Sequence, residues 1–200
     1  MKTAEQALAD VLERIGQACE RSGRSPGDVR LVAVSKTMAP ERVQEAMAAG
    51  QQVFGENRVQ EALEKIEAVG PGPEWHFIGH LQKNKVRHVT GRFALIHSVD
   101  SLDLARALNR RSEAAGQVQP VLLQVNQAGE STKHGTRPEQ LPALAGEVEG
   151  CTHLDLGGLM SIPPPEKDPE EARRWFIGLR ILRDRLAEGL GRDLPELSMG

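Results

Sequence analysis

Leu31-Val32-Ala33-Val34-Ser35-Lys36-Thr37 is a run of small and branched apolar residues that ends in a lysine. Such a run predicts a strand buried on both faces, as in a parallel sheet. Side chains alternate along a strand, so Lys36 is expected on one face and Ser35 on the other. Pro40 then opens a helix that Gly50 ends. Lys36 therefore falls where a buried strand stops and a helix is about to begin.

The rest of the chain alternates strand-like apolar runs with amphipathic helical runs. Thr3 and Gln6 have the spacing of a capping box at the start of the first helix, and Thr136 and Glu139 repeat it later. After the opening strand, further strands are expected at 52–56, 75–79, 94–99, 118–125, 154–162 and 195–198. Helices are expected at 3–21, 40–49, 59–69, 101–115, 136–148 and 168–186.

Strict alternation of this kind implies parallel strands joined by right-handed crossovers. Two α/β folds fit it, a closed TIM-type (β/α)8 barrel and an open doubly wound sheet. The open sheet needs a Gly-x-Gly-x-x-Gly turn after its first strand, and none follows Lys36. We therefore expect a barrel that forms a single domain over residues 1–200, with seven strands present and the eighth missing from the chain as given.

The composition is that of an ordinary folded protein. Of the 200 residues, 39% are hydrophobic and 26% are charged, which suffices for one core. A formal net charge of −3 gives no general attraction to nucleic acid or to an anionic membrane. Cys19 and Cys151 resemble buried thiols in a reducing compartment rather than a disulfide framework. Because no long apolar run suggests a signal peptide or a membrane span, a cytoplasmic protein is expected.

Polar residues gather at the expected strand ends, which would share one rim in a barrel. Lys36 is a candidate for Schiff-base chemistry, because partial burial and nearby cations would lower its pKa and leave the amine neutral. The alternative is a solvated lysine that merely ends a strand. The end of any buried strand is a place where polar residues begin, so one polar residue there is weak evidence of a site. Several such residues on one rim are stronger evidence than any one of them. Its other members are Glu56, Asn57, His80, Asn126, Ser161 and Ser198.

Two further features bear on cofactors. His76 and His80 share strand parity, yet no cysteine or carboxylate completes a ligand set at recognisable spacing, so no metal is expected. Ser198-Met199-Gly200 follows the last strand, where barrels often bind phosphate through backbone N–H groups. A basic stretch after the third strand is expected to be a solvated helix face, because no aromatic residues interleave to stack on bases. It comprises Lys83, Lys85, Arg87, His88 and Arg92.

Six motifs together resemble the pyridoxal phosphate homeostasis protein family. In chain order they are LVAVSKT at 31–37, FGEN at 54–57, WHFIG at 75–79, LQ-x-NK at 81–85, GLM at 158–160 and LSMG at 197–200. They span nearly the whole chain at family-like spacing. The resemblance implies a single barrel like the N-terminal domain of alanine racemase, without that enzyme's second domain. It also implies pyridoxal 5'-phosphate (PLP) bound as an internal aldimine on Lys36.

The resemblance assigns further residues. Asn57, Met160 and Ser198 match family positions around the cofactor, and Ser198 and Gly200 match positions near its phosphate. The family is understood to bind PLP, to take part in PLP homeostasis and to deliver the cofactor to PLP-dependent apo-enzymes, without catalytic turnover of its own. A monomer is the default expectation.

Two other classes of function stay open. One is an enzyme, either a PLP-dependent amino-acid racemase or decarboxylase, or a cofactor-free Schiff-base aldolase that uses Lys36. The other is a binding module for a phosphorylated metabolite. Racemases of related fold pair a lysine with a tyrosine, and this chain contains no tyrosine.

Members of the family continue past the LSMG motif. Their next segment is a helix, followed by an eighth strand with an Arg-x-Gly-Thr-like motif. That segment would complete the phosphate site and supply an arginine that faces the pyridine nitrogen. We therefore expect the natural protein to continue beyond Gly200 in the same way.

Overall fold

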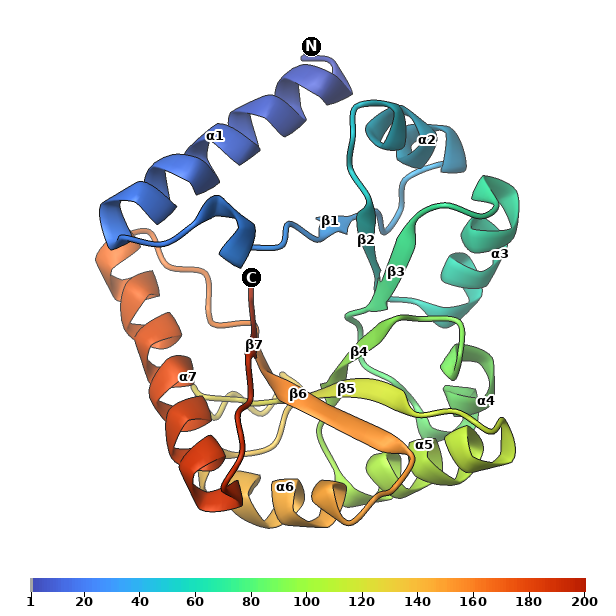
Figure 1. Ribbon diagram of the computed structural model, residues 1–200, viewed down its shortest axis with the longest axis vertical. Coiled ribbons are helices and arrows are strands. Elements are labelled where there is room, and N and C mark those ends of the chain that lie inside the picture. The colour runs from blue at the N-terminus through green and yellow to red at the C-terminus, as the bar shows by residue number, and fades with distance from the viewer. Residues whose placement is uncertain (1) are drawn as a thin grey trace. The chain divides into compact units, whose positions relative to one another are not determined.

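Strands and helices alternate through residues 2–200, the part of the chain that the computed structural model describes (Figure 1). The chain divides into two compact units, with the boundary inside strand β3, between His76 and Phe77. Each unit is described by itself. The expectation of a single domain over residues 1–200 stays a prediction.

The first unit extends to His76 and opens with the longest helix of that unit. The Thr3 side chain accepts a hydrogen bond from the Gln6 N–H, and the Gln6 side chain accepts one from the Thr3 N–H, so the expected capping box is confirmed. A short 3-10 turn covers Pro26–Asp28. The elements of this unit are α1 (Ala4–Ser22), β1 (Ala33–Val34), α2 (Pro40–Ala48), β2 (Val53–Glu56), α3 (Val59–Val69) and β3 (Glu74–Phe77).

The second unit carries the remaining four strands of the described chain. Two more 3-10 turns lie at Lys83–Lys85 and Pro138–Gln140. Asp168 caps the longest helix through a hydrogen bond from the Glu170 N–H to its side chain. The elements are α4 (Val86–Val89), β4 (Leu95–Val99), α5 (Leu102–Ala114), β5 (Gln119–Gln124), α6 (Leu141–Glu149), β6 (Leu154–Ser161), α7 (Pro169–Leu190) and β7 (Glu196–Met199).

Within each unit, neighbouring strands follow the order of the chain. In the first unit β1 pairs with β2 in parallel. In the second, β4, β5, β6 and β7 pair in parallel one after another. A doubly wound sheet would reverse its strand order part-way, and neither unit does so. The predicted parallel α/β alternation is therefore confirmed.

Each unit buries apolar side chains between its strands and helices. In the first, the Phe54 and Trp75 rings lie 5.6 Å apart, and Ala62 of α3 is fully buried. In the second, Phe77 meets Phe93 edge-on at 5.4 Å, and Leu179 of α7 is fully buried. Burying a side chain of this size stabilises a fold by about 1.5–3 kcal/mol. None of the helices within residues 2–200 combines the length and apolar character needed to cross a bilayer.

Two local expectations are wrong. Strand β1 covers only Ala33–Val34, and Val34 is 49% exposed, so this strand is not buried on both faces. Thr136 does not cap a helix, because its backbone is tied to β5. The Thr136 N–H donates to the Gln124 carbonyl at 2.8 Å, and the Thr136 carbonyl accepts from the Asn126 N–H at 2.9 Å.

Strand β6 contains a bulge at a pair of glycines. The register with β5 shifts so that Val121 faces Leu156 while the next residue, Leu122, faces Gly158, which leaves Gly157 as the extra residue. Gly158 also pairs with Glu196 of β7. A Cβ atom on Gly158 would lie 1.9 Å from the Glu196 carbonyl oxygen, so only glycine lets β7 approach β6 here.

We predict that Gly158→Ala lowers the free energy of unfolding by about 1–3 kcal/mol, because the added methyl group forces β7 away from β6. Gly157→Ala is the matched control, since the nearest atoms to its Cβ would lie at an ordinary 3.5 Å. Urea unfolding followed by circular dichroism measures both. Equal unfolding midpoints for the two variants would contradict the close approach.

Candidate functional site

Lys36 lies just beyond the paired part of β1. The last ladder bond runs from the Ser35 N–H to the Gly55 carbonyl at 3.0 Å. The Lys36 side chain is exposed, as is Val34 on the same face of the strand. The partial burial expected for Lys36 is therefore wrong, whereas its predicted position at the end of the first strand is confirmed.

The turn after Lys36 is held by its own backbone and by helix α3. The Met38 N–H donates to the Ser35 carbonyl at 3.0 Å. Thr37 has a positive φ of 63°, which is unusual for a β-branched residue. Its N–H donates to the Glu61 carboxylate, a charged acceptor that offsets the strain. The backbone on both sides of Lys36 is thus fixed while its amine stays exposed.

A buried ion pair supports the end of β1. Glu56 is 0% exposed and Lys65 is 3% exposed, and the Lys65 ammonium donates to the Glu56 carboxylate. The same ammonium donates to the Ser35 carbonyl at 2.6 Å and pairs with Glu61 at 3.1 Å. The Ser35 hydroxyl donates to Glu56 at 2.7 Å. Three acceptors surround the Lys65 ammonium, and two donors meet Glu56 Oε1, while Glu56 Oε2 has no hydrogen-bond partner among residues 2–200. A buried ion pair is tolerated only where further hydrogen bonds of this kind accompany it.

Sequence reasoning missed the role of Lys65. The residue lies on the face of α3 that buries Ala62, three positions earlier. A lysine within an apolar helical stripe is the signal that could have revealed it, because such a charge requires a buried partner. Glu56, at the end of a buried strand, is that partner.

Asn57 comes directly after strand β2. If the register of β1 and β2 is continued by two residues, position 36 faces position 57. Asn57 is half-buried, and its side-chain oxygen is buried without a hydrogen-bond partner among residues 2–200. A buried acceptor left open is costly, and it is often completed by a ligand or by water. The first unit thus brings two of the predicted site residues to neighbouring strand ends.

Met160 and Ser198 are register partners on β6 and β7 in the second unit. The Met160 side chain is 2% exposed and packs in an apolar cluster with Leu95 and Leu122. Because the side chain is enclosed in this way, its role is to shape the core around β6.

Ser198 points toward a buried histidine. Its hydroxyl oxygen lies 2.8 Å from His97 Nδ1, and His97 belongs to strand β4. Gly200 comes directly after β7 and is exposed, and open space surrounds the position that a Cβ would occupy. Sequence reasoning missed His97, since a histidine within a buried strand gives no sign of which polar side chain it meets.

Asn126, another predicted rim residue, is used structurally. Its side-chain amide donates to the carbonyls of Glu130 at 2.9 Å and Lys133 at 3.2 Å. These bonds fold the loop after β5 back onto the strand. Ser161 is 2% exposed at the end of β6.

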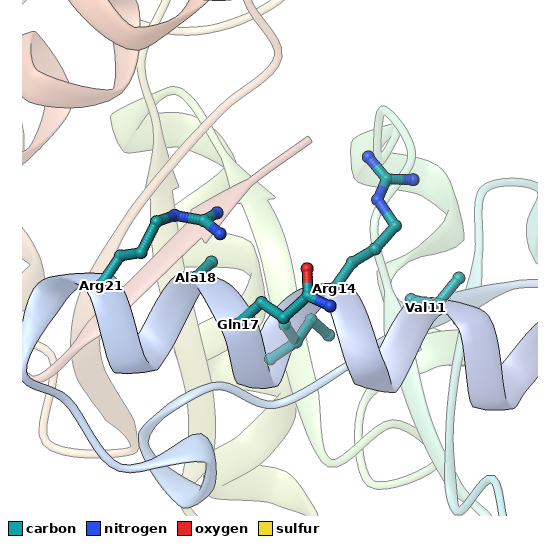
Figure 2. A pocket seen from close by; sticks show the side chains of 6 residues that line it. Val11, Arg14, Gln17, Ala18 and Arg21 are labelled. Atoms are coloured by element: carbon teal, nitrogen blue, oxygen red, sulfur yellow. The ribbon is translucent and has the colours of Figure 1, made fainter.

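One surface pocket follows a single face of α1 (Figure 2). The side chains of Arg14 and Arg21 rise from the same side of the helix, with Ala18 between them. None of the predicted site residues lines this pocket. Its full lining is Val11, Arg14, Ile15, Gln17, Ala18 and Arg21.

Parallel strands that alternate with helices, and a lysine at the end of the first strand, define a class: α/β proteins of the barrel type with a lysine at the rim. The chain matches the family described as alanine racemase, N-terminal domain, over residues 6–200. It is also 45% identical to the pyridoxal phosphate homeostasis protein of Aquifex aeolicus (strain VF5) over 196 residues, which cover 98% of this chain and 86% of the relative. The chain belongs to the alanine racemase N-terminal domain family and, within it, to the pyridoxal phosphate homeostasis proteins.

Solved structures agree with this assignment. PipY of Synechococcus elongatus PCC7942, in its structure with PLP bound, has a TM-score of 0.80 and 34% identity and covers 93% of this chain and 88% of its own. An alanine racemase of Clostridium difficile 630 has a TM-score of 0.72 and 17% identity, covering 94% of this chain and 50% of its own. The second likeness concerns the fold alone. The predicted family and the barrel-type fold are confirmed, and an eighth strand after residue 200 stays a prediction.

The Glu61 contact gives a prediction for pH. The hydrogen bond from the Thr37 N–H lowers the pKa of Glu61 below its ordinary value of 4.5, with help from Lys65 and Arg58 and against the effect of burial. A lowered pKa means that the stabilisation is present above the unfolded-state value and is lost as the pH falls through the folded-state value. Glu61→Gln should therefore lower stability at neutral pH and lose part of the decline on acidification.

Thermal midpoints measured from about pH 7 to about pH 3 test this expectation. Glu67→Gln, an exposed site on the same helix, is the matched control. Parallel pH curves for the wild type and Glu61→Gln would contradict the role given to the Thr37 contact.

Proposed function

We propose that this protein binds PLP through Lys36 and takes part in maintaining the intracellular supply of that cofactor, without catalytic turnover of its own. The observation that carries the proposal is the Lys36 turn, in which the backbone is fixed from α3 while the amine is exposed. Membership of the pyridoxal phosphate homeostasis proteins and the PLP-bound structure of PipY support it.

The residues around Lys36 fit the cofactor. When bound, PLP supplies an aldehyde carbon to which an amine can attach. The Lys36 amine would form that bond with loss of one water, and its exposed position gives the aldehyde access. The side-chain oxygen of Asn57 is buried without a hydrogen-bond donor among residues 2–200, so it is free to accept a hydrogen bond from a ligand. Because the buried ion pair lies on the Ser35 side of the strand, it orients the backbone without competing for the Lys36 amine.

The resemblance to the family assigns further residues, which belong to the second unit. We assign Ser198 and Gly200 to the phosphate, because hydroxyl and backbone N–H groups are the donors that phosphate sites use and open space surrounds the Cβ position of Gly200. His97 would hold the Ser198 hydroxyl in one orientation. Met160 would shape the apolar surroundings rather than touch the reacting atoms, since it is almost fully buried.

Several finer statements belong to the same proposal. PLP-dependent apo-enzymes are the expected recipients of the cofactor, and a cytoplasmic monomer is the expected form of the protein. The net charge of −3 favours neither nucleic acid nor an anionic membrane as a partner.

We predict that Lys36→Ala abolishes the yellow absorbance of the PLP-loaded protein while the helical circular dichroism signal is kept, because an exposed rim side chain adds little to the core. Borohydride reduction followed by intact-mass measurement should show one cofactor per wild-type chain and none in the variant. Lys83→Ala is the control, since this exposed lysine pairs only with Asp103 among the described residues. Peptide mapping that finds the reduced adduct mainly on another lysine would overturn the assignment.

A second expectation concerns turnover. Racemisation needs one base on each face of the substrate carbon, and the chain has no tyrosine to stand opposite Lys36. We therefore expect PLP-loaded protein to form D-alanine from L-alanine far more slowly than about one per second, an ordinary enzyme rate. Chiral chromatography measures the product, with an alanine racemase as the positive control. Turnover at ordinary enzyme rates would contradict the proposed carrier role and favour the racemase-like alternative.

A further inference from the structure

Three metal-ligating side chains of the second unit come together from separate segments. They are His80, which follows β3, Asp100, which follows β4 directly, and His134, which lies in the loop after β5. One possible ligand atom from each lies within 4.8 Å of the other two. Because each segment follows the carboxyl end of a parallel strand, the chain delivers all three side chains to one edge of this unit.

The two histidine rings are held face to face. Their centroids lie 3.6 Å apart and the ring planes differ by 8°. The His134 backbone is anchored, because its carbonyl accepts a hydrogen bond from the Gln124 side chain at 3.2 Å. Two residues further on, Thr136 is bridged to Val125, which follows β5 directly. The loop thus presents His134 at a fixed place opposite His80.

The Asp100 carboxylate is mostly buried, and its contact with His80 is too long for a hydrogen bond. It is 14% exposed, and its Oδ2 atom lies 3.9 Å from His80 Nδ1, beyond hydrogen-bond range. A mostly buried carboxylate costs free energy unless a donor or a cation satisfies it. Two lysines that neighbour the cluster in the sequence are engaged elsewhere, Lys133 with Glu130 and Lys83 with Asp103, each at 2.9 Å.

The geometry points to a binding site for one divalent transition-metal ion of the zinc type, held by His80, Asp100 and His134. Two imidazoles and one carboxylate form a known ligand set for such ions, with one position left for water or another ligand. Ligand bonds of about 2.0–2.2 Å in a tetrahedral arrangement put ligand atoms about 3.3–3.5 Å apart. Side-chain rotations that separate the stacked rings and close the widest spacing of 4.8 Å by about 1.3–1.5 Å complete the site.

No metal site is expected from the sequence, and the two histidines that share strand parity, His76 and His80, are not the pair that converges. His76, the histidine that shares strand parity with His80, is buried and contacts Glu74 at 2.7 Å. The carboxylate and the second histidine come instead from loops far along the chain. None of the three ligands belongs to the residues proposed for PLP. A test of the metal site is therefore independent of the proposed function.

The test is a titration of the full-length chain, freed of metal with a chelator, with Zn²⁺ alone in isothermal calorimetry. The wild type should bind one ion per chain in a saturable step. His80→Ala, His134→Ala and Asp100→Asn should each weaken that step by about tenfold or more, because even residues that only orient metal ligands are worth 10–100-fold. Circular dichroism confirms that each variant is folded.

His153→Ala is the matched control, because this partly exposed histidine lies outside the cluster and contacts Thr152 at 3.1 Å. It should bind Zn²⁺ as the wild type does. Co²⁺ in place of Zn²⁺ should give the visible absorption of a four-coordinate ion in the wild type and in His153→Ala only. No saturable binding by the wild type, or wild-type affinity in any one of the three ligand variants, would overturn the three-ligand site.

Discussion

The ion pair between Lys65 and Glu56 is the interaction on which the Lys36 turn depends. Both side chains are withdrawn from water, and removing one partner of such a pair costs about 3–5 kcal/mol because the other charge is left buried. Ser35 supplies further contacts to the pair, because its hydroxyl donates to Glu56 and its carbonyl accepts from Lys65. These contacts among Ser35, Glu56 and Lys65 fix the position at which β1 ends.

Helix α3 therefore positions Lys36 through hydrogen bonds to the backbone of its two neighbours, Ser35 and Thr37. Lys65 and Glu61, one turn apart on α3, hold the backbone before and after Lys36. The strain of the positive φ at Thr37 is compensated from outside the turn. The charged residues that hold the turn thus contact its backbone, and the Lys36 side chain remains exposed to solvent.

In the second unit, the residues proposed to bind ligands are positioned by the bulge between two strands and by the fold of one loop. The Gly157–Gly158 bulge lets β7 lie against β6 and so sets the register that pairs Ser198 with Met160. The loop after β5 is folded back by Asn126, which carries His134 toward His80. The first effect follows from the close approach of two backbones, and the second from hydrogen bonds that the Asn126 side-chain amide donates to loop carbonyls. Neither requires a charged side chain at the position it controls.

The sequence by itself determined the alternation of strands and helices, the parallel pairing, the family and the position of Lys36, because these follow from local periodicity, capping residues and motif order. It did not determine the exposure of β1 or the true partners of Thr136. Only the tertiary structure decided that Lys65 serves Glu56, that His97 meets Ser198, and that His80, Asp100 and His134 converge. These contacts join residues of different strands, helices and loops, and such pairing is set by packing and register, which leave no fixed spacing in the sequence.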